Sequence, residues 1–155
     1  MLRRILYTIF TLLLIAPAVN AQRLVIGEKA PDIRVGEWYK GNSASTSGTA
    51  VLLDFFHSSN DQCVRALPRL NTIQKDYSGK LNVIVITKES MSSVSPYLDG
   101  KDYSFYLGND EGGKTFNSFN VRLVPFSVLL DGSGKVAWTG NVGSLTDDII
   151  RRALR

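Results

Sequence analysis

The stretch that most constrains the fold of this chain runs from Val51 to Pro68, V-L-L-D-F-F-H-S-S-N-D-Q-C-V-R-A-L-P. Its first part is rich in branched and aromatic residues, which is typical of a central strand covered on both faces. The residues from Ser58 to Asp61 favour a helix N-cap, and apolar residues then recur at helical spacing as far as Ser78-Gly79. We therefore predict a buried strand, a short polar turn, and a helix that packs on the sheet.

The rest of the chain predicts a mixed sheet with helices on both faces. Leu81 to Thr87 is typical of a second buried strand, and residues 121–131 and 135–139 predict an antiparallel hairpin through a glycine-rich turn. The shorter predicted elements are an edge hairpin over residues 24–35, a helix over Ser90 to Leu98, a strand over Tyr103 to Leu107, a helix over Gly113 to Phe119, and a final helix over Leu145 to Leu154 capped by Ser144. This order of elements indicates one α/β domain.

The first 21 residues have the pattern of a secretory signal peptide. Arg3 and Arg4 precede an apolar run, and Val19 and Ala21 supply the small residues of an A-x-A-like cleavage site. We predict cleavage after Ala21, a single domain over residues 22–155, and a periplasmic or secreted protein. The alternative is an uncleaved anchor, the only arrangement in which we expect contact with a membrane. No cysteine lies directly after the apolar run, which excludes a lipoprotein anchor.

Charge and cysteine content narrow the possible partners and cofactors. The chain has a formal charge of +4, and its charged residues are mixed along the sequence, so nothing favours a nucleic-acid partner. Cys63 is the only cysteine, so no internal disulfide can stabilise an exported domain. One cysteine and one histidine also fall short of the three or four ligands of a zinc site. We expect neither a metal nor a cofactor.

Three segments of the chain together resemble the thioredoxin-like TlpA/ResA and redoxin proteins of the bacterial periplasm. They are G-E-K-A-P-D-I, the strand-turn-helix stretch, and V-P-F-S-V-L-L-D-G-S-G-K-V. Asp54 lies nine residues before Cys63, and Pro68 five residues after it, as the buried acid and the helix-kinking proline do in that family. Pro125 matches the proline whose cis peptide bond faces the active-site cysteines. The resemblance implies a thioredoxin-like fold and thiol-disulfide oxidoreductase activity on a protein or peptide partner.

The active-site motif of that family is incomplete in this chain. Members with dithiol activity carry W-C-x-x-C, and the matching residues here are Ser59, Asn60, Asp61, Gln62 and Cys63. In the family the first cysteine attacks a substrate disulfide and the second resolves the mixed disulfide. The resemblance therefore places Cys63 in the resolving position and Asn60 in the attacking position, where an amide cannot replace a thiolate. A dithiol cycle within one chain is excluded.

Two functions stay open. In the first, Cys63 forms a mixed disulfide with a partner or a small thiol, helped by the N–H dipoles of a helix start and by Asp54 as a buried proton acceptor. A small buried core residue is the alternative for Cys63, and the Asp54 carboxylate would raise the pKa of its thiol. In the second, the protein is a non-catalytic binding module whose Val124–Pro125 turn holds an extended peptide by strand-like pairing. Any mechanism that uses the thiol needs a Cys63 that solvent can reach.

A one-cysteine peroxidase is a third, weaker possibility. Peroxiredoxins place their thiolate near the position of Cys63 in a P-x-x-x-T-x-x-C motif, but Phe56 and Asn60 stand where that motif has proline and threonine. His57, the only histidine, lies six residues before Cys63 and could activate the thiol. No third orienting group is evident in the sequence. We therefore interpret His57 as a residue of the turn.

Overall fold

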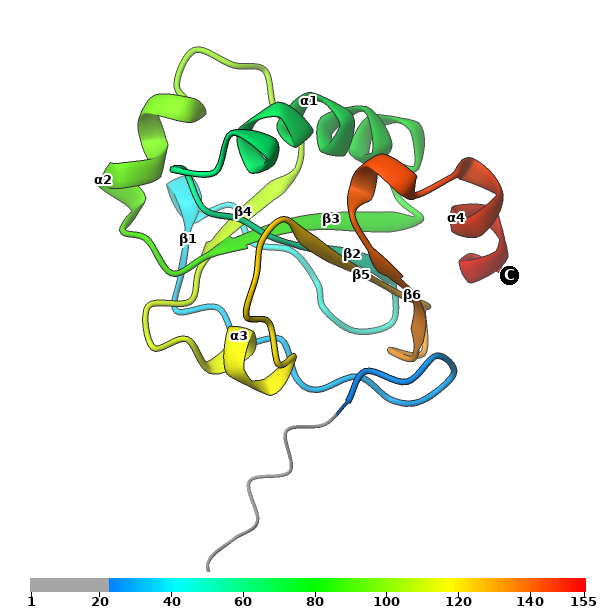
Figure 1. The fold of residues 1–155 in the computed structure, drawn as a ribbon. Helices are drawn as coiled ribbons and strands as arrows, with labels where there is room; N and C mark the ends of the chain where they lie inside the picture. The colour runs from blue at the N-terminus through cyan, green and yellow to red at the C-terminus, as the bar shows by residue number, and fades with distance from the viewer. Residues whose placement is uncertain (1–22) are drawn as a thin grey trace, which may run out of the picture.

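A computed structural model describes residues 23–155 of the chain (Figure 1). The predicted signal peptide and its cleavage site lie outside these residues. The described chain contains one six-stranded sheet in the order β1-β4-β3-β2-β5-β6. The strands are β1 (Glu37–Trp38), β2 (Ala50–Phe55), β3 (Leu81–Thr87), β4 (Tyr106–Asn109), β5 (Phe126–Leu130) and β6 (Val136–Gly140).

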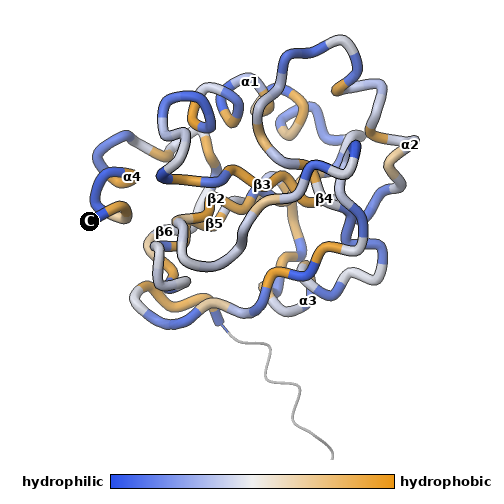
Figure 2. Tube along the Cα trace, turned by 180° about the vertical axis from the view of Figure 1, so that it is seen from behind, coloured by the Kyte–Doolittle hydropathy of each residue, from blue (hydrophilic) through white to orange (hydrophobic). Residues whose placement is uncertain are grey.

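The strand β2 lies in the middle of this sheet. It pairs in parallel with β3 and antiparallel with β5, and all six of its residues are buried. Its side chains alternate between two apolar clusters, with Leu52 in one and Val51, Leu53 and Phe55 in the other. In Figure 2 the central strands are coloured mostly as hydrophobic. The predicted mixed sheet is confirmed, and its central strand has the predicted burial.

Helices cover both faces of the sheet (Figure 1). The α-helices are α1 (Asp61–Asp76), α2 (Met91–Val94), α3 (Lys114–Ser118) and α4 (Asp147–Ala153), and the 3-10 helices are η1 (Tyr39–Gly41), η2 (Ser95–Tyr97) and η3 (Val142–Ser144). The helices α1, α2 and α4 pack on the face that carries Leu52, and α3 packs on the opposite face. No helix within residues 23–155 has the length and apolar character needed to cross a membrane.

The N-terminal segment differs from its prediction. The hairpin expected over residues 24–35 does not form, and Pro31 lacks the N–H that a paired strand would need there. The segment instead runs beside the start of β6. The Gly27 N–H donates to the Val136 carbonyl, the Val136 N–H donates to the Glu28 carbonyl, and Lys29 and Lys135 form an isolated antiparallel bridge. It therefore covers part of the outer edge of β6.

The final helix also begins later than predicted. Its N-cap is Thr146, whose side chain accepts a hydrogen bond from the Ile149 N–H. Ser144, the predicted cap, lies in η3 and donates its hydroxyl to the Asn141 carbonyl instead. Leu145 is buried, so the chain enters the core before the helix starts.

Candidate functional site

The candidate site lies where the parallel strands β2 and β3 end and α1 begins. The carboxyl ends of parallel strands lie at one edge of a sheet, where α/β proteins commonly bind ligands. The turn that leads into β5 reaches the same place, because β5 pairs with β2 and its first residue, Phe126, is opposite Phe55. The structure thus brings the predicted residues of the strand-turn-helix stretch next to the Val124–Pro125 turn.

Asn60, at the predicted attacking position, joins the helix to this turn. It is the N-cap of α1, and its Oδ1 accepts hydrogen bonds from the backbone N–H groups of Gln62 at 2.9 Å and Cys63 at 3.4 Å. Its Nδ2 donates to the Val124 carbonyl at 2.9 Å. The peptide bond between Val124 and Pro125 is cis. An amide therefore connects the helix start to the turn at the place that the resemblance assigns to a thiol.

Cys63 lies in the first turn of α1 and is completely buried, with a relative exposure of 0%. Burial raises the pKa of its thiol, a hydrogen bond with the His57 backbone lowers it, and the nearby carboxyl groups of Asp54 and Glu89 raise it further. The net effect is a raised pKa, so the dipole of α1 does not produce a thiolate here. The condition for either thiol mechanism, a thiol that solvent can reach, is not met in this conformation.

Asp54 is a buried carboxyl group in β2, on the same face of the sheet as Leu52 and α1. Burial raises its pKa to about 7, although a hydrogen bond from Ser127, which lowers the pKa, partly opposes this. The Ser127 hydroxyl donates to Oδ1 at 2.6 Å, whereas Oδ2 has no hydrogen-bond partner among residues 23–155. A carboxyl group with such a pKa can bind or release a proton near neutral pH.

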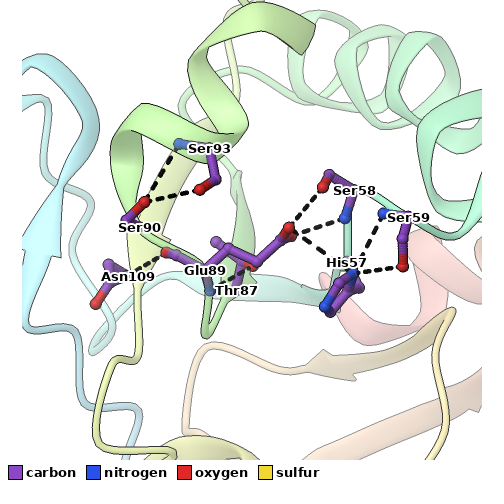
Figure 3. Close-up of polar contacts among 8 residues, drawn as sticks. All are labelled: His57, Ser58, Ser59, Thr87, Glu89, Ser90, Ser93 and Asn109. Carbon is purple, nitrogen blue, oxygen red and sulfur yellow. Dashed lines mark hydrogen bonds and ion pairs between the residues drawn. The ribbon is translucent and has the colours of Figure 1, made fainter.

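Glu89, which the sequence reasoning missed, fixes the turn before α1 (Figure 3). Its side chain, 14% exposed, accepts the Ser58 N–H at 2.7 Å, the Ser58 hydroxyl at 2.5 Å and the Thr87 hydroxyl at 3.2 Å. Burial alone would raise the pKa of Glu89, but the hydrogen bonds from Ser58 and the nearby His57 outweigh it and lower the pKa. The carboxylate therefore holds the turn against the end of β3.

His57 belongs to the same hydrogen-bonded cluster. Its Nδ1 accepts the Ser59 N–H at 3.2 Å, lies 2.9 Å from the Ser59 hydroxyl, and is 3.8 Å from a Glu89 oxygen. Because the serine and the glutamate meet the same ring nitrogen, this is not a hydrolase relay, in which they occupy opposite nitrogens. The ring orders the turn, in keeping with our interpretation of His57 as a turn residue.

The other matched positions of the motif are exposed. Asp61 and Gln62 lie at the start of α1, where Asp61 is 3.9 Å from Arg65 in an exposed ion pair.

No three His, Cys, Asp or Glu side chains within residues 23–155 gather in a way that could hold a metal ion.

Two of the missed residues had a signal in the sequence. Glu89 is an acidic residue just after a buried strand, at the edge of the sheet where parallel strands end. Ser127 is a polar residue inside an apolar strand, and the register places it opposite Asp54.

Comparisons with known proteins agree with this architecture. A family model described as thioredoxin-like matches residues 48–136. The thiol-disulfide oxidoreductase ResA of Bacillus cereus is 26% identical over 147 residues, with 86% of this chain and 85% of the relative covered. The crystal structure of the Chlorobium tepidum protein named as thiol:disulfide interchange protein DsbE has a TM-score of 0.75 at 25% identity, over 85% of this chain and 99% of that one.

A further solved structure, the exposed lipoprotein thioredoxin of Streptococcus pneumoniae, has a TM-score of 0.58 at 25% identity, over 70% of this chain and 84% of that one. In sequence and in fold, the chain is similar to thiol-disulfide oxidoreductases.

Proposed function

Because this chain belongs to the thioredoxin-like family, we propose that it is an exported thioredoxin-fold protein that binds a peptide or protein partner at the Val124–Pro125 turn. The observation that carries this proposal is the complete burial of Cys63, the only thiol of the chain. A buried thiol with a raised pKa is a poor nucleophile. Binding at the turn needs no thiol.

The turn has features that suit an extended partner. Val124 and Pro125 are partly exposed, and Leu123 just before them is 84% exposed. A carbonyl oxygen has two lone pairs, so the Val124 carbonyl can accept a partner N–H in addition to the Asn60 amide. An extended peptide would then pair with the turn through its main chain, while Leu123 would contact an apolar side chain.

A second candidate function is single-thiol exchange, and the observation that favours it is Asp54, with its pKa of about 7 and its unpartnered Oδ2. In this reaction Cys63 would transfer its proton to Asp54 and attack a partner disulfide as a thiolate. A new bond would form between the Cys63 sulfur and one partner sulfur. The other partner sulfur would leave as a thiolate and take up a proton. The start of α1 would have to open first, because Cys63 is buried.

Export is also part of the proposal. The first 21 residues have the pattern of a signal peptide, and one structural neighbour is named as an exposed lipoprotein. A periplasmic or secreted location follows from cleavage after Ala21. Detection of mature protein beginning at Gln22 outside the cytoplasm would support it, and a full-length protein retained in the cytoplasm would contradict it.

The two functions are separated by one peptide whose thiols are blocked and one peptide that contains a disulfide. We expect the S-carboxymethylated B chain of insulin, with a fluorescent label, to bind Cys63→Ala within about twofold of the unchanged protein. Leu123→Asp, an exposed substitution, should weaken this binding about tenfold through the loss of apolar contact. Lys101→Asp, at an exposed position on another loop, serves as the control for added negative charge, and it changes the charge by more than Leu123→Asp does.

The reactivity of the Cys63 thiol tests the alternative function, single-thiol exchange. We expect iodoacetamide to modify Cys63 at least about 100-fold more slowly in the folded protein than in urea, because modification needs local opening. Formation of a mixed disulfide between Cys63 and an oxidised peptide, together with loss of peptide binding in Cys63→Ala, would overturn the binding proposal in favour of single-thiol exchange.

A further inference from the structure

A small cavity lies beside the candidate site, at the edge of the sheet where β2 and β3 end. It has a volume of about 130 Å³ and is bordered by the ends of β2 and β3, by α3, and by the chain just before the Val124–Pro125 turn. Four apolar side chains line it, those of Phe56, Phe116, Val121 and Val124, and the remaining lining residues are His57, Lys88 and Arg122. Neither function proposed above uses this cavity as such.

The apolar part of the cavity is well fixed. Phe56 and Phe116 are 2% and 5% exposed, and the Phe116 ring packs edge-on against Phe55 with 4.8 Å between the ring centroids. The Val121 N–H donates to the Phe116 carbonyl at 2.9 Å, which holds the wall of the cavity to α3. A buried apolar space of about 150 Å³ is large enough for benzene. The cavity can therefore take one aliphatic side chain.

The polar part of the cavity is cationic. Neither Lys88 nor Arg122 forms an ion pair with any residue in the described part of the chain. The Lys88 ammonium group lies over the Phe116 ring, with its Nζ 5.0 Å from the ring centre. No carboxylate lines the cavity, and the neighbouring Glu89 already accepts three hydrogen bonds.

We propose that this cavity binds the carboxyl-terminal residue of a peptide partner. An aliphatic side chain would rest on the aromatic floor, and the terminal carboxylate would bind at Lys88 and Arg122, which can form charge-assisted hydrogen bonds with it. One carboxyl-terminal residue supplies both the apolar group and the charge, whereas an internal acidic residue supplies only the charge. This inference rests on the proposed function, because Val124 belongs both to the cavity and to the binding turn.

Two short peptides that differ only at the carboxyl terminus test the proposal. The protein, labelled with ¹⁵N, is titrated with acetyl-Gly-Gly-Leu and with its carboxyl amide, and amide shifts are followed by NMR at low ionic strength. We expect the free acid to bind about tenfold more tightly than the amide, with the largest shifts around Phe116 and Val121. Raising the salt concentration should shrink this difference.

Variants show whether the two cations cause the preference. Arg122→Gln and Lys88→Gln, both at exposed positions, should each reduce the preference for the free acid to about threefold or less. Arg65→Gln removes an exposed cation that does not line the cavity and should leave the preference unchanged. Equal binding of the acid and the amide would overturn the carboxyl-terminal proposal while leaving binding at the turn intact. Absence of binding by both peptides at millimolar concentration would overturn both proposals.

Discussion

Asn60 joins two parts of the candidate site, the start of α1 and the Val124–Pro125 turn. Its side chain makes three hydrogen bonds, two to the start of α1 and one to the Val124 carbonyl. Asparagine is among the best N-cap residues, so its bonds to the helix could be foreseen from the sequence. The bond to Val124 could not, because it joins residues 64 positions apart and depends on the tertiary fold. At the position that the resemblance assigns to the attacking thiol, this chain has an amide that caps α1.

Asn60→Cys should restore a C-x-x-C pair with Cys63 and, with it, part of the dithiol activity. We expect measurable reduction of insulin in the presence of dithiothreitol, which the unchanged protein should lack. In the reduced state the variant should be less stable by about 1–2 kcal/mol because it loses a capping side chain. Urea unfolding measures that cost.

The matched control for this test is Asn60→Ser, which keeps a capping oxygen but adds no thiol. It should retain most of the stability and show no activity. A folded Asn60→Cys variant that neither forms a disulfide with Cys63 nor reduces insulin would contradict the matching of Asn60 with the attacking cysteine.

The sequence predicted most accurately the helices and strands that have long apolar patterns. β3 has the predicted bounds, Leu81–Thr87, and α1 begins among the predicted capping residues. The hairpin over residues 24–35 was wrong because that short segment pairs with β6 instead of with itself. In short segments, contacts with distant parts of the chain outweigh local preference.

The same limit applies to the candidate site. The spacing along one strand-turn-helix unit predicted that Asp54 and Cys63 belong to one region, and the resemblance to the thioredoxin-like family added the Val124–Pro125 turn. It did not predict the clamp between Glu89 and Ser58, which lie 31 positions apart. Such contacts depend on how neighbouring strands end, and the sequence shows that only after the order of the strands is known.

Glu89→Gln tests whether this clamp holds β3 to the turn before α1. A glutamine keeps the shape of the side chain but loses the charge that strengthens both hydrogen bonds from Ser58. We expect a loss of about 1–2 kcal/mol in the free energy of unfolding, since hydrogen bonds to charged groups are the stronger ones. The amide hydrogens of Ser58 and Ser59 should exchange faster with solvent. Glu111→Gln, at an exposed position, is the control; equal stability of the two variants would show that the clamp contributes little.

At the scale of the whole molecule, buried and hydrogen-bonded carboxyl groups have opposite effects on stability. The pKa of Asp54 is raised by burial, so the folded protein keeps a proton there that the unfolded chain releases. Asp131, just after β5, has a carboxylate that accepts hydrogen bonds from Ser133 and Lys135. For Glu89 and Asp131, hydrogen bonds to the carboxylate outweigh burial and lower the pKa, so the folded protein binds a proton less readily than the unfolded chain does. Stability should therefore fall both as the pH rises above the ordinary range of a carboxyl group and as it drops below that range.

Among the contributions of Asp54, Glu89 and Asp131 to the free energy of unfolding, the sum should be greatest near pH 4. Between pH 3.8, the ordinary pKa of an aspartate, and about pH 7, the unfolded chain releases the Asp54 proton whereas the folded protein keeps it. The stability of the folded protein should therefore fall as the pH rises through this range. The full fall for such a shift is about 4 kcal/mol. Below pH 4.5, the ordinary pKa of a glutamate, stability should also fall as Glu89 and Asp131 become protonated and lose the advantage of their hydrogen bonds.

Asp54→Asn isolates the first of these effects. The amide cannot ionise, so the decline between pH 4 and pH 7 should largely disappear, whereas the decline below pH 4.5 should stay because Glu89 and Asp131 are unchanged. The readout is the slope of stability against pH, measured by urea unfolding at several pH values. The slope is more informative than the absolute stability, because the new amide also places a donor where Oδ2 has no partner among residues 23–155. Parallel curves for Asp54→Asn and the unchanged protein between pH 4 and pH 7 would show that Asp54 does not carry the raised pKa.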